Sequence, residues 1–499
     1  MVGRSTLMSL GLAFAACGGG SGDTATDSGS GTTSPTLDPT AQPAGSSGSA
    51  AEDSETDGPT GGSMTGSVSD TEGAPTSSGD PTVSSDPTDD STTGTACVGL
   101  ECQIDPCDGN KDATKIRGTV YAPEGTLPLY NVTVYVPNAP LAPETEGVTC
   151  DTCSDQLPGD PIVATLTDTA GQFVLEGVPS GAQIPLVIRV GKWRREITVD
   201  VTACGETVVA PELSRLPRNQ SEGHMPRMAL TTGGSDPFEC LLRKLGIDDA
   251  EFTPPDGPGR VNLFAGRGGA DHYGDSLNGG ADFDAHVDLW NDAARLKLYD
   301  IVMLACEGGE HPEDKSDQAK ANIIEYAGVG GRLFLEHWHK VWVEEGLDAW
   351  PTVATFNDQA DLPSPTTAEI DTSFPKGEAL SDWMINVGGS MSPGQMEIVQ
   401  GQHTIDAVDD ALATRWVYTD DPTVSVQYFT FNAPVGVPDD QQCGRVVDSD
   451  IHVSSGDQVA PFPDGCTTTE LTPQEKALIF MFFELSSCLI PDDEDPIPG

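Results

Sequence analysis

Apolar and polar residues alternate with period two in several short runs between residues 115 and 216. Such alternation predicts β-strands with one buried face. Glycine and proline separate the runs at short intervals, a spacing typical of an all-β sandwich. We therefore predict a sandwich over residues 115–216, with strands in the runs Ile116–Tyr121, Tyr130–Val136, Ala164–Thr167, Gln172–Leu175 and Leu186–Val190.

The pattern changes at His224, where continuous apolar strands begin to alternate with helical segments. Strands that are buried on both faces and separated by helices predict a parallel sheet with helices on its two sides. We expect a flavodoxin-like α/β domain over residues 224–490, with an insertion at about 342–424 and an acidic tail at 491–499. Its predicted parallel strands are Met228–Thr232, Arg260–Ala265, Asp300–Ala305 and Gly330–His337.

Two helix starts are marked in this second domain. Asp236, followed by a proline, predicts the cap of its first helix. Thr472 and Glu475 form a capping box around another proline and predict that the last helix begins there. The continuation Ala477–Leu485 is apolar on nearly all sides, so we expect it to be buried.

The first residues resemble a bacterial lipoprotein signal. Arg4 precedes the apolar run Leu7–Ala16, and small residues stand directly before Cys17. The resemblance implies that residues 1–17 are a signal peptide with a lipobox and that Cys17 becomes the lipidated N-terminus. Gly18, rather than an aspartate, favours sorting to the outer membrane or the cell surface. The alternative is an ordinary secreted protein with a cysteine near its cleavage site.

Residues 18–96 contain no Lys, no Arg and no aromatic residue, and consist mainly of Gly, Ser, Thr, Pro and Asp. Such a segment cannot bury enough apolar surface to offset the entropy of ordering, so we predict a disordered linker. Behind a lipidated cysteine it would act as a tether that holds folded domains away from a membrane. The alternative is a tail with no positional role.

The whole chain is strongly acidic, with a formal net charge of -53 and a pI near 4.1. Phosphate backbones and anionic lipid surfaces would repel such a protein, so we expect no nucleic-acid partner. The most apolar later stretch, Ala477–Ile490, contains Glu484 and is shorter than the ~20 residues that a membrane span requires.

Twelve cysteines also indicate export. Cysteines of exported proteins usually pair, and if Cys17 carries a lipid, an odd number remains and at least one thiol stays free. A bond between Cys443 and Cys466 would close the loop that they bracket. Cys150 and Cys153 allow a local disulfide or half of a zinc site, and the lack of a second such pair favours the disulfide. The disulfide candidates are Cys97, Cys102 and Cys107 in a Cys-rich segment at residues 97–114, together with Cys150, Cys153, Cys443 and Cys466.

Thr167–Phe173 and Gly177–Gly181 resemble the "T-D-x-x-G-x-F … G-V-P-x-G" pattern of carboxypeptidase regulatory-like domains. The resemblance covers the predicted sandwich and implies a transthyretin-like fold. It implies little about activity, because such domains mostly serve as spacers or binding modules, and some relatives have a carbohydrate-binding-like fold.

A dense basic patch follows in the same domain: Lys192, Trp193, Arg194 and Arg195. Trp193, Arg194 and Arg195 are candidates for stacking a sugar or binding an acidic partner. The alternative is that the patch packs against the protein's own acidic neighbouring domain.

Tyr326–His337 resembles the "Y-x-x-x-G-G-G-F-x-x-x-H" motif of the ThuA-like branch of the class I glutamine-amidotransferase-like fold. Gly444–His452 resembles a late strand of that family but lacks the glycine before the histidine. The resemblance covers about residues 226–488. In glutamine amidotransferases a nucleophilic cysteine stands in the elbow after the fourth strand and is served by a late histidine. Because His337 stands at the elbow here, the resemblance implies no catalytic nucleophile there and no glutamine hydrolysis.

Ligands of an open parallel sheet bind at the carboxyl ends of its strands. The candidate metal ligands at these ends are Glu307, Glu336, His337, His339 and His452, of which His337, His452 and Glu336 are also the catalytic candidates, and Trp338 is a candidate ligand contact. A divalent metal there would activate water for hydrolysis. The alternatives are metal or ligand binding without catalysis, and histidines that only hydrogen bond to loop carbonyls. Cys306 could replace the missing nucleophile or pair with Cys240 or Cys488.

These observations lead to two hypotheses of function. The first is a surface-anchored lipoprotein that acts as a binding or structural module, with the membrane as partner through its lipid and a carbohydrate or protein as ligand. The alternative is an extracellular metal-dependent hydrolase that uses the crevice around His337. Apart from a divalent metal at this crevice, no cofactor is expected.

Overall fold

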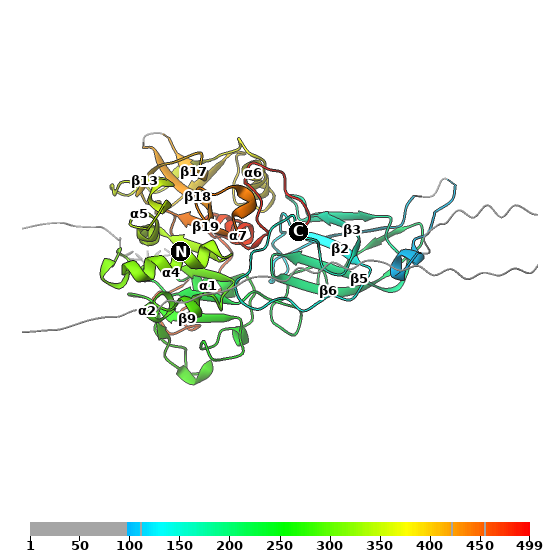
Figure 1. Cartoon of the computed structure of the whole chain (residues 1–499), viewed down its shortest axis with the longest axis horizontal. Coiled ribbons are helices and arrows are strands. Elements are labelled where there is room, and N and C mark those ends of the chain that lie inside the picture. Colours follow the sequence, from blue (N-terminus) through cyan, green and yellow to red (C-terminus); the bar gives the residue numbers. More distant parts are fainter. Residues whose placement is uncertain (1–96, 110–111, 421–422, 454–455) are drawn as a thin grey trace, which may run out of the picture. The chain divides into compact units, whose positions relative to one another are not determined.

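The computed structural model describes residues 97–499 except 110–111, 421–422 and 454–455. The predicted signal peptide, Cys17 and the predicted linker at residues 18–96 lie outside the described residues. The described chain forms a multidomain layout, in which a β-rich part precedes a large mixed sheet with helices (Figure 1).

Seven strands in two sheets form the first part. One sheet has the order β4-β1-β7 and the other the order β3-β2-β5-β6. Ile116 and Phe173 of the first sheet share a hydrophobic core with Val134 and Ile188 of the second, so the two sheets pack as a sandwich. The strands are β1 (Lys115–Thr119), β2 (Thr133–Pro137), β3 (Pro161–Leu166), β4 (Gln172–Glu176), β5 (Gly181–Val190), β6 (Trp193–Val201) and β7 (Glu206–Val208).

A ten-stranded sheet with the order β10-β9-β8-β11-β12-β19-β18-β17-β14-β15 forms the second part. The pairs from β10 to β19 are parallel, and the pairs from β19 to β15 are antiparallel. The strands are β8 (Met228–Thr231), β9 (Val261–Ala265), β10 (Asp284–Ala285), β11 (Ile301–Leu304), β12 (Arg332–Glu336), β14 (Thr366–Ile370), β15 (Gln395–Ile398), β17 (Ala413–Thr419), β18 (Ser425–Ala433) and β19 (Gly444–Ser449); β13 (Ala354–Phe356) and β16 (Ile405–Val408) pair separately.

The predicted flavodoxin-like parallel sheet is therefore only half of the sheet that forms. Strands β14, β15 and β17 come from the segment at residues 342–424 that we predicted as an insertion. Instead of forming a separate body, this segment extends the sheet in antiparallel fashion beyond β18. The prediction of a wholly parallel sheet is wrong for this part, because β18, β17, β14 and β15 each run antiparallel to the preceding strand in the sheet order.

Helices cover both faces of the parallel half, as predicted. Val302 and Leu304 of β11 pack in a cluster with α2, α3 and α4, whereas Ile301 and Met303 pack in a cluster with α1 and α7. The α-helices are α1 (Phe238–Lys244), α2 (His286–Trp290), α3 (Ala293–Leu296), α4 (Asp317–Gly328), α5 (Val341–Glu344), α6 (Pro375–Asn386) and α7 (Pro473–Ser486). The short 3-10 helices are η1 (Gly99–Gln103), η2 (Asp249–Glu251), η3 (Asn278–Gly280), η4 (Pro312–Asp314), η5 (His337–Lys340), η6 (Trp350–Thr352) and η7 (Asp439–Gln441).

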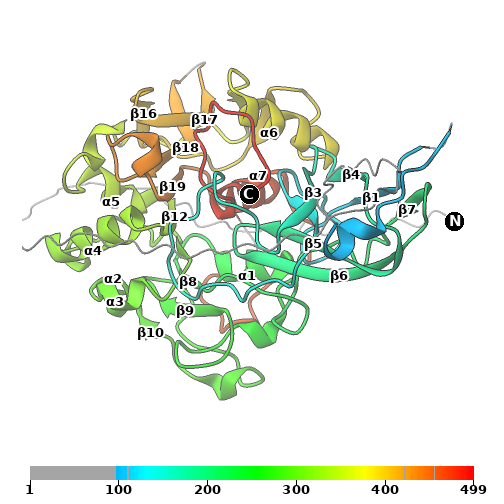
Figure 2. The same cartoon turned by 45° about the vertical axis from the view of Figure 1, so that its right-hand side comes forward.

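The last helix, α7, joins the sandwich to the sheet. Its predicted capping box is present: the side chain of Thr472 accepts from the backbone of Glu475, and the Glu475 side chain accepts in return. Phe480 stacks on Tyr130 of the sandwich part at 5.8 Å between ring centroids, and the opposite contacts of the helix are with β12 and β19. Figure 2 shows α7 in red between these two parts. Its burial on nearly all sides follows from this position.

The structure contains five disulfides, of which the first is local and the other four link distant segments: Cys97–Cys102, Cys107–Cys204, Cys150–Cys443, Cys153–Cys488 and Cys240–Cys466. All seven candidate cysteines are paired, and so are Cys204, Cys240 and Cys488. The local bonds that we considered between Cys150 and Cys153 and between Cys443 and Cys466 are wrong, because each of these cysteines bonds a distant partner. Cys306 is the free thiol, so its expected pairing with Cys240 or Cys488 is wrong too.

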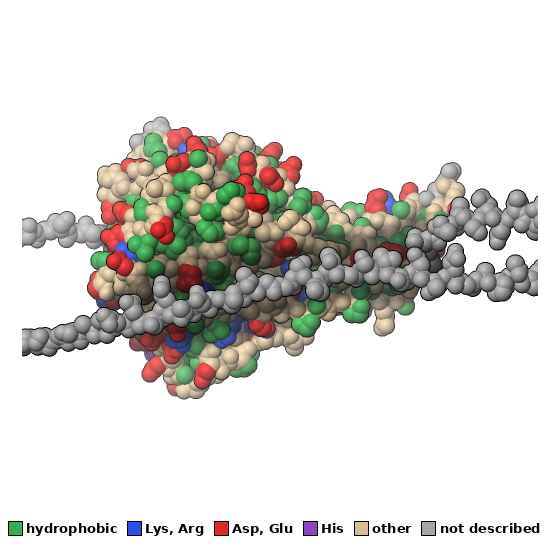
Figure 3. Space-filling view, in the orientation of Figure 1, with side chains coloured by type: hydrophobic (Ala, Val, Ile, Leu, Met, Phe, Trp, Pro, Cys, Tyr) green, Lys and Arg blue, Asp and Glu red, His purple; other side chains and the backbone are tan. Residues whose placement is uncertain are grey.

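The disulfides agree with a protein that matures outside the cytosol, where thiols oxidise. In the part of the chain that the structure describes, none of the helices has the length and apolarity needed to cross a membrane. Figure 3 shows Asp and Glu side chains spread over the visible face, with fewer Lys and Arg among them.

Candidate functional site

The carboxyl ends of four adjacent parallel strands bring five polar side chains together. Asp236 follows β8, and Cys306 follows β11. Glu336 is the last residue of β12, and His337 comes directly after it. His452 follows β19. All five are buried, with exposed fractions between 0% and 7%, and we call this cluster the His337 centre.

Two carboxylates hold one nitrogen of His452. Its Nδ1 lies 2.6 Å from Oε1 of Glu336 and is hydrogen bonded to Oδ2 of Asp236. The other oxygen of Asp236 accepts from the backbone N–H of Val453. Nε2 on the other side of the imidazole is buried and has no hydrogen-bond partner among the described residues. The two carboxylates therefore fix the orientation of the ring through Nδ1.

The thiol of Cys306 lies beside the second imidazole. Its Sγ is 3.5 Å from Nδ1 of His337 and accepts from the backbone N–H of Gly308 at 3.4 Å. The backbone N–H of Cys306 donates to Oε2 of Glu336 at 2.6 Å. The rings of His337 and His452 meet edge to face, with their centroids 4.9 Å apart. Glu336 thus connects the cysteine to the late histidine.

His337 occupies a sharp turn between β12 and η5. Its φ is +46°, in the left-handed region that residues other than glycine seldom adopt. The strand-to-helix turn that the sequence resemblance implies is therefore present, and the side chain at this position is an imidazole. The thiol that the structure does place nearby, on Cys306, comes from the neighbouring strand.

The electrostatics of the centre do not favour a reactive thiolate. Burial, reinforced by the Glu336 charge, raises the pKa of the Cys306 thiol. Burial and the charge of His452 hold the pKa of His337 well below its usual range. Burial alone would lower the pKa of His452, but the Asp236 and Glu336 carboxylates outweigh it and hold that pKa well above its usual range. With Cys306 protonated and His337 neutral, the centre lacks the ion pair of an activated cysteine nucleophile.

Glu307 and His339 belong to a neighbouring network. Oε2 of Glu307 pairs with Nζ of Lys315 at 3.0 Å, and its Oε1 accepts from the backbone of Arg267. Nε2 of His339 donates to the Ala305 carbonyl at 3.0 Å, and its Nδ1 accepts from the indole of Trp342. Both nitrogens of His339 are therefore occupied, and burial lowers its pKa to about 3. Of the five predicted metal ligands, Glu336, His337 and His452 therefore lie in the His337 centre, whereas Glu307 and His339 do not.

The residues that we predicted as ligand contacts, Trp338 and the basic patch, lie in different places. Trp338 is half-buried and lies against His337, with ring centroids 4.5 Å apart. Trp193 is fully buried against aromatic side chains of α7 and has no exposed face on which a sugar could stack. Lys192 Nζ pairs with Asp300 of the α/β part at 2.5 Å, while Arg194 and Arg195 bind a carboxylate and backbone carbonyls of the sandwich part. Lys192 and Trp193 therefore contact the neighbouring domain, as the alternative for this patch expected, whereas Arg194 and Arg195 bind within the sandwich part.

Sequence reasoning missed the role of Asp236. We predicted it to cap α1, but the cap residue is Pro237, without a side-chain cap bond, and the Asp236 carboxylate binds His452 instead. No local signal distinguishes these two uses, because the partner is 216 residues away. The position of Cys306 at a strand end did indicate the site, but we also considered a disulfide for this residue and did not include it among the site residues.

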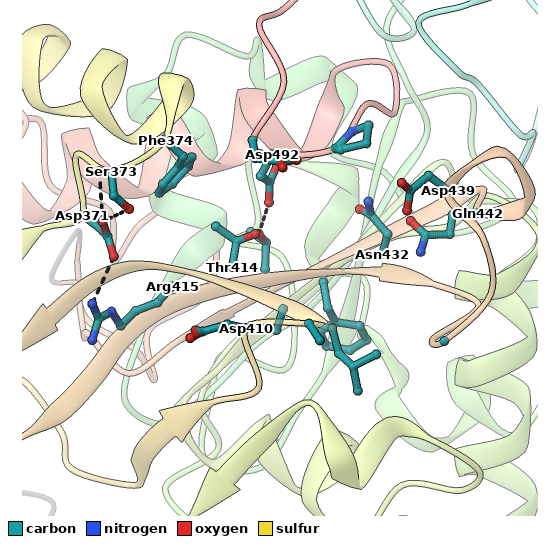
Figure 4. Close-up of a pocket in the computed structure, with 18 of the residues that line it drawn as sticks. Asp371, Ser373, Phe374, Asp410, Thr414, Arg415, Asn432, Asp439, Gln442 and Asp492 are labelled. Carbon is teal, nitrogen blue, oxygen red and sulfur yellow. Dashed lines mark hydrogen bonds and ion pairs between the residues drawn. The ribbon is translucent and has the colours of Figure 1, made fainter.

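A second candidate site is an open pocket of about 650 Å³ over β17 and β18 (Figure 4), here called the β17–β18 pocket. Asp371 accepts from the hydroxyl of Ser373 at 2.6 Å and pairs with Nη2 of Arg415 at 3.1 Å. The carboxylates of Asp410 and Asp439 are exposed, and Figure 4 draws no contact for either. Further lining residues with amide or hydroxyl groups are Thr414, Asn432 and Gln442, whereas the hydroxyl of Thr430 is buried and hydrogen bonded to Asp492.

A larger hollow of about 1070 Å³ lies between the sandwich part and α1. Two of its cationic side chains pair with carboxylates, whereas those of Arg218 and Lys476 donate, among the described residues, only to backbone carbonyls. Arg243 pairs with Asp249 at 2.7 Å, and Lys244 pairs with the buried Glu475 at 2.8 Å. The one cationic residue that lines the β17–β18 pocket in the described chain, Arg415, pairs with Asp371, so this pocket is the better candidate for a neutral polar ligand.

No family model matches this chain, and no curated protein matches it. Among solved structures, a ThuA-like protein from Bacteroides uniformis is similar to 52% of this chain over 90% of its own length, with 11% identity and a TM-score of 0.28. A type II cohesin–X-dockerin complex from Acetivibrio cellulolyticus contains a chain similar to 27% of this one over 85% of its length, with 14% identity and a TM-score of 0.15. These TM-scores are too low to support an argument about the fold, so the description of the architecture depends on the strand topology given above.

Proposed function

We propose that this protein is an exported, membrane-tethered binding protein and that its β17–β18 pocket takes a neutral carbohydrate. The observation that carries the proposal is the polar lining of this pocket, in which the exposed carboxylates of Asp410 and Asp439 have no ion-pair partner among the described residues. Its volume of about 650 Å³ lies within the range of pockets that hold small ligands.

The chemistry of the pocket suits hydroxyl groups. Carboxylates accept hydrogen bonds from sugar hydroxyls, while the Gln442 amide and the Thr414 hydroxyl both donate and accept. The guanidinium of Arg415 donates, but Asp371 already neutralises it. The chain has a net charge of -53 and would repel an anionic ligand, so a neutral ligand is favoured.

The tether supports the same function. The lipobox-like start and the linker at residues 18–96 would hold the domains outside the membrane, with the sandwich part, which resembles a carboxypeptidase regulatory-like domain, between the linker and the α/β domain. Export agrees with the five disulfides. Labelling with a fatty-acid analogue tests the lipid: incorporation that is lost in Cys17→Ser supports the anchor, and equal labelling of both proteins refutes it.

Binding is tested with the full chain on an array of neutral and anionic glycans, followed by calorimetry on any ligand found. A hydrogen bond to a charged group contributes about 1.5–3 kcal/mol, so Asp410→Asn and Asp439→Asn should each weaken binding by about tenfold or more. Asp382→Asn, on an exposed face of α6, is the matched control and should bind like the wild type. Binding that all three variants retain would place the ligand elsewhere.

A second candidate function is the metal-dependent hydrolase, favoured by the converging side chains of the His337 centre. A metal held there would supply activation of water. Burial argues against it, because no side chain of the centre is more than 8% exposed and a substrate would need an opening. Hydrolysis of a chromogenic ester or glycoside that is lost in His337→Ala but kept in Asp410→Asn would favour this function over the first.

A further inference from the structure

We propose that Cys306, His337 and His452 bind a zinc ion as three protein ligands, with the fourth position left to water or a small ligand. One donor atom from each residue lies within 4.8 Å of the other two. This inference does not depend on the β17–β18 pocket, and it holds whether or not the centre hydrolyses anything.

The orientation of His452 is the first argument. A metal-binding histidine almost always donates its second ring N–H to a carboxylate or carbonyl. Nδ1 of His452 contacts both Asp236 and Glu336, and its Nε2 is buried with no hydrogen-bond partner among the described residues. An unpartnered buried nitrogen costs free energy, and a metal ligated by Nε2 would remove that cost.

The spacing of the other two ligands is the second argument. Zinc binds thiolate sulfur at about 2.3 Å and imidazole nitrogen at about 2.0–2.1 Å, so tetrahedral coordination separates the two atoms by about 3.6 Å. Sγ of Cys306 and Nδ1 of His337 are 3.5 Å apart. The backbone N–H of Gly308 points at the same sulfur, as suits a thiolate that carries negative charge.

The surroundings hold the three ligands in place. Each ligand directly follows, or lies just beyond, the end of a different strand of one sheet, β11, β12 or β19. Glu336 accepts from the backbone of Cys306 and contacts His452, so one carboxylate positions two of the ligands. Ligands on rigid elements with such support are pre-organised for a metal.

Other sets of ligands fit less well. Asp236, Glu336 and His452 also converge, but Nδ1 of His452 is already hydrogen bonded to Asp236 and ion-paired with Glu336, so these carboxylates orient the histidine. His339 is excluded because both of its nitrogens have partners. A thiolate with two imidazoles suits zinc better than Mg²⁺ or Ca²⁺, which prefer oxygen ligands.

Metal content of the full chain is the direct test. Protein from zinc-supplemented culture is dialysed against a chelator and its zinc is measured by mass spectrometry. We expect about one zinc per chain in the wild type and in His272→Gln, which changes an exposed histidine outside the centre. Cys306→Ser and His452→Gln should retain at least tenfold less. Wild-type protein that retains no more zinc than Cys306→Ser would overturn the proposal.

A second measurement guards against variants that fail to fold. Cobalt replaces zinc in such sites, and a cobalt–thiolate bond absorbs strongly in the near ultraviolet. We expect this band in the wild type, and its absence there would overturn the proposal without any variant. The same band in Cys306→Ser would also overturn it, since the sulfur would come from elsewhere. Intense visible absorption with Cu²⁺, together with no retained zinc, would overturn the choice of metal.

Discussion

Sγ of Cys306 lies 3.5 Å from Nδ1 of His337, although the two residues are 31 positions apart and end neighbouring strands. The contact brings together the one free thiol among the described cysteines and the residue at the strand-to-helix elbow. Because both are buried, the pair is shielded from solvent reagents. This arrangement distinguishes a structural or metal-binding centre from a reactive cysteine site.

The metal-free protein should therefore react slowly with thiol reagents. Cys306 is fully buried and burial raises its pKa, so at pH 8 we expect labelling at least about 100-fold slower in the native than in the urea-unfolded state. The difference between wild type and Cys306→Ser isolates this thiol in a colorimetric assay without reductant. Equally fast labelling of native and unfolded protein would contradict the burial of Cys306.

Glu239 of α1 should make the stability depend on pH. It is 2% exposed, and burial raises its pKa from 4.5 to about 8. Between these values the unfolded chain binds fewer protons than the native one, so this group lowers the free energy of unfolding as the pH rises from about 4.5 to 8. Glu239→Gln should match the wild type best at pH 5 and exceed it by a few kcal/mol at pH 9.

Urea unfolding at pH 5, 7 and 9 measures this effect. Glu196→Gln, which changes an exposed glutamate of β6, is the control and should show no comparable pH-dependent gain in stability. A constant difference between Glu239→Gln and wild type across the three pH values would show that Glu239 titrates normally.

The disulfides Cys150–Cys443 and Cys153–Cys488 should be non-additive. When one of these two bridges is absent, the other closes a long loop. When one is present, the other closes only a short loop that consists of residues 150–153 and 443–488. Because Cys240–Cys466 also shortens the long loops, loop-closure entropy predicts about 4 kcal/mol for the loss of either bridge and about 5 kcal/mol more for the loss of the second. Denaturant unfolding of the two single and the combined Cys→Ala pairs measures these costs. Equal costs in every background would contradict this explanation.

The capping box of α7 should contribute measurably to stability. Thr472 accepts from the backbone of Glu475, and loss of such a cap costs about 1 kcal/mol. Thr472→Ala should lower the free energy of unfolding by about this amount, whereas Thr468→Ala, at an exposed position before the helix, should leave it unchanged. A Thr472→Ala protein as stable as the control would show that the cap is dispensable.

Local signals predicted the elements that depend on neighbours in sequence. The capping box at Thr472 marked the start of α7, and continuous apolar runs marked β8, β9, β11 and β12 within one or two residues. These features depend on hydrogen bonds and burial patterns within a few positions. The antiparallel strands β14 and β15 were not predicted, because their pairing depends on where the sheet edge lies.

The candidate site was only partly predictable for the same reason. Its position at the carboxyl ends of parallel strands followed from the fold class, which identified Glu336, His337 and His452. The place of Asp236 depended on contacts with residues far along the chain, and the strand-end position of Cys306 did not show whether its thiol was free. Likewise the pairing of Cys150 with Cys443 depends on a fold that brings together positions 293 apart.

The bridge between Cys153 and Cys488 also determines how the protein would carry a mechanical load. When force is applied between Cys97 and Gly499, the shortest covalent path runs along residues 102–153, through this disulfide and along the residues after Cys488. Once this path is taut, the chain of the large sheet and the His337 centre lies outside it. A taut chain spans about 3.5 Å per residue. Stretching single molecules should therefore extend the oxidised protein by about 200 Å and the reduced protein by about 1,400 Å.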